Sequence, residues 1–226
     1  MPPYHLNKLE RLQFEKVLDV NKSIGDIRYR PMVASDVGPV PEDCQGSREA
    51  LLGRIEDLGG AAMLAFDGEQ HVAQLQFRRY DPMCRSAKGI WQPDYWGDFG
   101  EHAPDLPEAS VNIFCYHVGQ LSAGEERCPD YQGRGIGLAL LDHFLDWAAS
   151  REFAGVVAKF TPADRAVMGF MGGQPATAYT ARGFEVVSSW VDQQLSTAVV
   201  ERKIVPADSD PEVVARVGVC VKLLES

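Results

Sequence analysis

The residues with the clearest chemical meaning lie in one glycine-rich stretch, 131–137. It reads Tyr-Gln-Gly-Arg-Gly-Ile-Gly and directly precedes an apolar helical pattern. Glycines let a backbone approach a ligand closely, and the free N–H groups at a helix start bind phosphate oxygens. The stretch has neither the Lys-Ser/Thr of a Walker loop nor the GxGxxG spacing of a dinucleotide fingerprint. It therefore indicates a phosphate-binding turn of another kind, with a plain strand-to-helix turn as the alternative.

A second group of candidate residues lies just before this stretch. Histidine is the side chain most often used as a general base near neutral pH, so His117 is the first candidate for that role, with a structural histidine as the alternative. Glu125 and Glu126 are competing bases in the adjoining loop. Cys115 is two residues from His117, so the two side chains share one face of a strand. A cysteine nucleophile assisted by this histidine is a competing mechanism.

The elements that must position these residues form a strand–loop–helix–strand unit. Residues 110–118 are β-branched and aromatic and predict a strand, and 154–160 predict a second, apolar one. Between them, a helix begins at Gly135 and carries an apolar face. That face consists of Ile136, Leu140, Leu141, Phe144 and Ala148. Two strands joined through a helix are expected to be parallel, with a right-handed crossover.

The remaining elements follow from local signals. Ser47 and the Gly59-Gly60 pair bound a helix at 48–58. The Asp67-Gly68 pair predicts a hairpin between strands 61–66 and 71–80. We also expect strands at 27–33, 184–191 and 216–224, a short helix at 175–182 and a helical N-terminal extension at 1–26. Residues 192–215 remain ambiguous.

Residues 81–109 form a long insertion after the second hairpin strand. The segment is rich in proline and combines Trp91, Tyr95 and Trp96 with Asp94 and Asp98. Aromatic faces and carboxylates bind cations, so these three aromatic residues are candidates for binding a positively charged substrate. The alternatives are a satellite packing cluster and a homodimer surface.

Three segments together resemble one known family. Residues 132–137, Gln-x-x-Gly-x-Gly, resemble the Q/R-x-x-G-x-G/A signature of the GNAT superfamily of N-acetyltransferases. Residues 179–184, Tyr-Thr-Ala-Arg-Gly-Phe, resemble its Y-x-x-x-G-F element, and 27–31 followed by Asp36 resemble its first strand. The three segments also occur in the family's order.

The resemblance implies a fold of the α/β (α+β) class in a single domain spanning 1–226. Its mixed, largely antiparallel sheet would open between two central parallel strands, with helices on both faces. Acetyl-CoA would lie in that opening. The acetyl group would pass directly to a primary amine of a small molecule or peptide.

The resemblance also implies roles for individual residues. The backbone of six residues would hold the coenzyme A pyrophosphate: Gln132, Gly133, Arg134, Gly135, Ile136 and Gly137. The N–H near Val118 would stabilise the oxyanion at a bulge, and Tyr179 would donate a hydrogen bond to the leaving sulfur. A packed helix tyrosine is the alternative for Tyr179.

The sequence departs from the family pattern in two places. The connection 118–131 is longer than the family's, and Gly172-Gly173-Gln174 stands where the family often has Asn. A non-catalytic CoA-binding module is the alternative function.

The composition excludes several classes of binding partner. The chain has 226 residues, and 22 Lys and Arg against 32 Asp and Glu give a net charge of −10. Such a surface repels nucleic acid and anionic lipid. We expect a cytosolic protein, because neither a signal-peptide core nor a membrane-length apolar run is evident. The five cysteines lack the spacing of a metal site, so no metal is expected.

Overall fold

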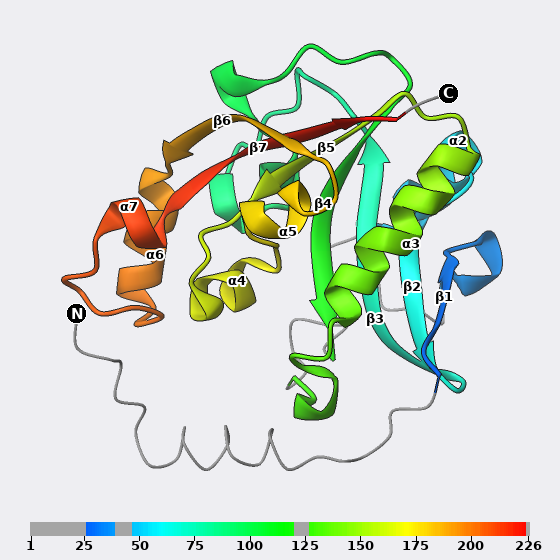
Figure 1. Ribbon diagram of the computed structural model, residues 1–226, viewed down its shortest axis with the longest axis horizontal. Helices are drawn as coiled ribbons and strands as arrows, with labels where there is room; N and C mark the ends of the chain where they lie inside the picture. Colours follow the sequence, from blue (N-terminus) through cyan, green and yellow to red (C-terminus); the bar gives the residue numbers. More distant parts are fainter. Residues whose placement is uncertain (1–25, 39–46, 120–126, 225–226) are drawn as a thin grey trace.

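The computed structural model describes residues 26–38, 47–119 and 127–224, and its centre is a seven-stranded sheet (Figure 1). The strand order is β1-β2-β3-β4-β5-β7-β6. The strands are β1 (Arg28–Pro31), β2 (Ala62–Asp67), β3 (Gln70–Arg79), β4 (Ser110–Val118), β5 (Gly155–Phe160), β6 (Glu185–Val191) and β7 (Arg216–Leu223). Strands β4 and β5 are parallel, and the other neighbouring pairs in this sheet are antiparallel. The predicted mixed sheet is confirmed.

Helices cover both faces of the sheet. The helices are α2 (Arg48–Leu58), α3 (Ile136–Ser150), α4 (Arg165–Met171), α5 (Ala176–Thr180), α6 (Gln193–Glu201) and α7 (Pro211–Val214). Helix α3 packs across β1 to β4 and shares the largest apolar cluster with Tyr179 of α5. Helix α2 packs on the opposite face, against Ala62 and Leu64 of β2. Helices α4 and α6 share a further cluster with Phe114 of β4 and Val217 of β7.

The local signals read from the sequence account for most of these boundaries. Helix α2 begins after Ser47, whose hydroxyl accepts a hydrogen bond from Ala50 N at 3.3 Å. It ends at Gly59, which has a φ of 81° and so adopts the left-handed conformation that favours glycine. Gly68 has a φ of 58° at the hairpin turn. Each of these boundaries can be predicted from the few residues next to it in the sequence.

Three parts of the chain differ from expectation. Helix α4 was not expected, and the ambiguous segment 192–215 contains α6 and α7. Asp192 and Asp210 begin these two helices by accepting hydrogen bonds from backbone N–H groups of the first turn, each at 2.9 Å. Strand β1 is shorter than 27–33, because the chain enters a 3-10 helix at Ala34–Asp36. The expected N-terminal extension lies almost entirely outside the described residues.

The parallel strands separate beyond their first four paired residues. Strand β4 pairs with β5 only from Ser110 to Ile113. Further along, Tyr116 N donates a hydrogen bond to Gly172 O at 2.8 Å, and Thr161 N donates one to Gln174 O at 2.9 Å. The connection between α4 and α5 therefore enters the fork between the two strands.

The bulge in β4 is earlier than the resemblance implies. Gln76 of β3 faces Cys115, but the next residue, Phe77, faces Ile113, which leaves Phe114 unpaired. The bulge is thus at Phe114 and not near Val118. The cause is the pairing register between β3 and β4, which no pattern within β4 alone determines.

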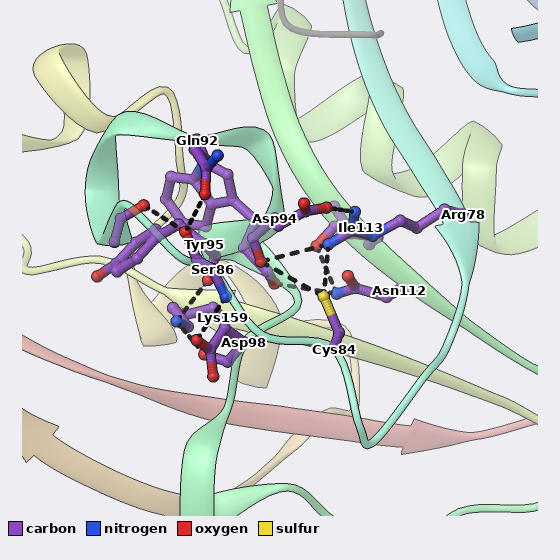
Figure 2. Close-up of polar contacts among 12 residues, drawn as sticks. Arg78, Cys84, Ser86, Gln92, Asp94, Tyr95, Asp98, Asn112, Ile113 and Lys159 are labelled. Atoms are coloured by element: carbon purple, nitrogen blue, oxygen red, sulfur yellow. Dashed lines mark hydrogen bonds and ion pairs between the residues drawn. The ribbon is translucent and has the colours of Figure 1, made fainter. Parts of the chain in front are cut away.

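Residues 81–109 are anchored to the sheet by a network of polar contacts (Figure 2). Arg78 of β3 forms an ion pair with Asp94 at 2.6 Å. The Asp98 carboxylate accepts a hydrogen bond from Ser86 N at 2.8 Å. Lys159 Nζ of β5 donates hydrogen bonds to two carbonyl oxygens, that of Tyr95 at 2.6 Å and that of Asp98. The insertion contains three short 3-10 helices: η2 (Gly89–Trp91), η3 (Pro93–Trp96) and η4 (Gly100–His102).

Lys159 makes the anchoring of the insertion sensitive to pH. Its side chain is buried, and burial lowers the pKa of the ammonium to about 8 from an ordinary value of 10.5. Between these values the unfolded chain binds more protons than the folded one, so stability rises with pH. From pH 7.5 to 9.5, wild type should gain roughly 2 kcal/mol in free energy of unfolding relative to Lys159→Met. Denaturant titrations at both pH values measure this difference, and a constant difference would contradict a depressed pKa.

Candidate active site

The glycine-rich loop presents its backbone to open space. Gly133 and Gly135 have φ values of 70° and 76°, which are strained for residues with a Cβ. Gly135 caps the N-terminus of α3, and a Cβ built on it meets no atom within 4 Å. In the first backbone hydrogen bond of the helix, Ala139 N donates to Gly135 O at 2.9 Å. The N–H groups of the residues between them therefore have no partner inside the helix and can bind an anion.

This loop forms one wall of a cavity of about 470 Å³, here called the glycine-loop cavity. Val118 at the end of β4 lines it as well, and Gln132 Nε2 donates a hydrogen bond to Val118 O. The cavity is lined by all the residues expected to bind coenzyme A: Val118, Gln132, Gly133, Arg134, Gly135, Ile136 and Gly137. Arg127 and Arg165 add positive charge to the lining. Backbone donors and guanidinium groups together suit a pyrophosphate.

A second cavity of about 510 Å³ lies beside the first and is here called the aromatic cavity. Its walls come from β4, the insertion, α4 and the end of α6. The two cavities share four lining residues: Tyr116, Arg127, Gly169 and Gly172. They therefore adjoin at the fork between β4 and β5.

The predicted base lines the aromatic cavity together with the competing nucleophile. His117 Nε2 lies 3.2 Å from Cys115 Sγ, as their spacing in the strand predicts. The bulge at Phe114 lies just before this pair and leaves both side chains on the cavity side of β4. The competing bases, Glu125 and Glu126, lie outside the described residues.

The predicted acid, Tyr179, lines neither cavity. Its side chain is 1% exposed, and burial raises the pKa of its phenol above the ordinary value. Its hydroxyl lies 3.5 Å from the hydroxyl of Tyr116. Tyr116 is also buried with a raised pKa, but it lines both cavities at their junction. Sequence reasoning missed Tyr116, because its place between Cys115 and His117 puts its side chain on the other face of β4, where a core position is expected.

The structure separates the aromatic residues of the insertion. Trp91 and Trp96 line the aromatic cavity, with Trp91 51% exposed and Trp96 buried. Tyr95 lies elsewhere, with its hydroxyl donating to Asp192 at 2.9 Å. Phe170 of α4 and Arg202, which follows α6, also line this cavity, and both come from segments whose structure the sequence left unassigned.

The described part of the chain offers neither a metal centre nor a membrane-spanning helix. It contains no group of three or more His, Cys, Asp or Glu side chains placed to hold a metal ion. None of its helices has the length and apolar character needed to cross a bilayer.

A parallel strand pair that separates beside a glycine loop at a helix start defines a fold class, that of the GNAT superfamily. Solved structures of N-acetyltransferases share the fold of this chain, which is the GNAT fold. An agmatine N-acetyltransferase mutant in its apo form has a TM-score of 0.52 and 15% identity, over 88% of this chain and 100% of that one. An N-acetyltransferase from Staphylococcus aureus Mu50 has a TM-score of 0.50 and 10% identity, over 89% and 100%. The protein yncA from Salmonella typhimurium, with its cofactor acetyl-CoA, has a TM-score of 0.50 and 13% identity, over 89% and 96%. No protein-family model and no curated protein sequence matches the chain.

Proposed function

We propose that this protein is an acetyltransferase that moves an acetyl group from acetyl-CoA to a primary amine. The observation that carries the proposal is the junction of two cavities at Tyr116, one lined by the glycine loop and one lined by His117. The similar fold of yncA, whose structure contains acetyl-CoA, supports the choice of cosubstrate. The aromatic cavity then receives the acceptor amine.

The residues that would hold the cosubstrate are those of the glycine-loop cavity. The N–H groups at the start of α3 and the guanidinium of Arg134 would bind the pyrophosphate oxygens. When bound, acetyl-CoA supplies an activated thioester carbonyl. The cavity reaches Tyr116 and Val118, so a chain extending from the loop along β4 would arrive at the aromatic cavity.

Three groups of this chain would then act on the reacting atoms. His117 would accept the proton that the amine must lose before it attacks. The backbone N–H of Val118 would stabilise the negative charge that develops on the carbonyl oxygen. The Tyr116 hydroxyl would donate a hydrogen bond to the sulfur as the C–S bond breaks, and Tyr179 would position that hydroxyl from 3.5 Å away.

Two tyrosine variants test this assignment of roles. Tyr116→Phe keeps the ring and removes the donor, so kcat should fall by about 10²- to 10⁴-fold with unchanged CoA affinity. Tyr179→Phe removes only a positioning contact, so its effect on kcat should be smaller. Steady-state kinetics on both variants compare the two losses of kcat, and CoA titrations check that the affinity for CoA is unchanged. A larger effect in Tyr179→Phe would assign the donor role to Tyr179, as the family resemblance implies.

The proposed function as a whole is tested by acetyl-CoA turnover. The assay detects free thiol released from acetyl-CoA with each member of a panel of primary amines. We expect release that depends on an amine and a product whose mass is increased by one acetyl group. CoA binding without release across the panel would favour the non-catalytic CoA-binding alternative.

A further inference from the structure

The aromatic cavity has a positive lining, although the chain as a whole is acidic. Arg127 and Arg202 both line it, and none of the described residues in its lining is Asp or Glu. The chain carries a net charge of −10, so this local excess of positive charge runs against the general composition. A lining of this kind attracts an anionic group.

Arg202 is placed as a recognition residue beside two aromatic rings. Its guanidinium carbon lies 4.4 Å from the centre of the Trp91 ring and 5.9 Å from that of Phe170. The two rings meet edge to face at 6.2 Å. A cation–π contact does not use the N–H donors that bind a carboxylate in a fork. Arg202 has no carboxylate partner among the described residues.

The nearby carboxylates of the insertion have other partners and do not line this cavity. Asp94 pairs with Arg78, and the Asp98 carboxylate accepts the N–H of Ser86 and of Gly100. A polycationic acceptor would therefore meet two arginines in the aromatic cavity and no carboxylate from the described part of the chain. This charge arrangement disfavours a polyamine.

We infer that the acceptor is a carboxylate-bearing amine with an aromatic body, of the kind represented by aromatic amino acids. Its carboxylate would bind Arg202, and its ring would pack among Trp91, Trp96 and Phe170. Its amine would lie near His117. This inference rests on the proposed function. In the reaction, His117 accepts one proton from the ammonium form of the acceptor, and the neutral nitrogen bonds to the acetyl carbon as the C–S bond breaks. A second nitrogen proton passes to the sulfur through the Tyr116 hydroxyl, so coenzyme A leaves as the thiol.

Matched substrate pairs test the inference. Phenylalanine and phenethylamine differ only in the carboxylate, as do tryptophan and tryptamine. Thiol release should show kcat/KM at least about 10-fold higher for the amino acid of each pair, because charge-assisted hydrogen bonds contribute to binding. Arg202→Gln should remove that preference by lowering the amino-acid value about 10- to 100-fold, with little change for the decarboxylated amine. Arg202→Lys should recover part of the loss, and Arg28→Gln, on the exposed β1 edge, should change nothing.

Direct binding separates this inference from the proposed function. Calorimetric titrations with phenylalanine and phenethylamine in the absence of acetyl-CoA measure the cavity's charge preference without turnover. Tighter binding of phenylalanine that is lost in Arg202→Gln supports the inference, even if no amine is acetylated and the proposed function fails. Equal or tighter binding of the decarboxylated amine, or no binding of either compound, overturns it. Turnover of phenethylamine in preference to phenylalanine also overturns it while leaving the acetyltransferase proposal intact.

Discussion

Replacing Gly135 with valine is expected to lower CoA affinity by about 100-fold or more. The φ of 76° at this position is strained for a β-branched residue, so the loop must change conformation. The N–H groups at the start of α3 then no longer converge on one anion, and losing two charge-assisted hydrogen bonds costs about 3 kcal/mol or more. At saturating CoA, wild type should melt roughly 5–10 °C higher than without it, and Gly135→Val should show no shift.

Gly100→Val is the matched control for this variant. Gly100 also has a positive φ, 56°, and open space around its Cβ position, but it lies in the insertion. The substitution imposes a similar backbone strain without touching the glycine-loop cavity. It should lower the melting temperature of the free protein and leave the CoA-induced shift unchanged. A lost shift in both variants would mean that general destabilisation, not loop geometry, controls CoA binding.

Replacing His117 with glutamine is expected to lower kcat by about 10²- to 10⁴-fold. The amide retains polar contacts in the aromatic cavity but cannot accept a proton at neutral pH. CoA affinity should stay near the wild-type value, because His117 does not line the glycine-loop cavity. His143→Gln provides the control, since that exposed histidine stacks on Tyr29 and faces away from both cavities. If His117→Gln retains the wild-type kcat, another group must act as the base.

Cys115→Ser distinguishes direct transfer from a cysteine nucleophile. The 3.2 Å contact between Cys115 Sγ and His117 Nε2 is compatible with either route. Direct transfer predicts kcat within a few-fold of wild type and no acetylated cysteine by mass spectrometry. Loss of activity in Cys115→Ser, together with an acetyl group on Cys115 in wild type, would establish the covalent route instead.

Features that depend on short stretches of chain could be predicted from the sequence. The glycine loop, the start of α3 and the hairpin at Gly68 each depend on conformations that glycine adopts readily. The parallel pairing of β4 and β5 follows from the strand–helix–strand order. Because the coenzyme loop is one continuous segment, all six of its predicted residues line a single cavity.

Features that depend on pairing between distant segments could not be predicted. The bulge at Phe114 depends on the register between β3 and β4, and the entry of Gly172 into the fork depends on the path of α4. Tyr179 was assigned from the family pattern, but Tyr116, on another element, lies between it and both cavities. Arg202 follows α6, whose buried Leu195, Ala198 and Val199 have helical spacing that was detectable in principle. Its place beside Trp91 was not detectable in the sequence.

Coenzyme A is expected to bind in the glycine-loop cavity through its pyrophosphate. A calorimetric titration of the wild-type protein with CoA, repeated in the presence of inorganic pyrophosphate, tests this binding most directly. We predict saturable binding at one CoA per chain, and an apparent affinity that falls as pyrophosphate competes for the N–H groups of the loop. The absence of binding at millimolar CoA, or an affinity unaffected by saturating pyrophosphate, would contradict it.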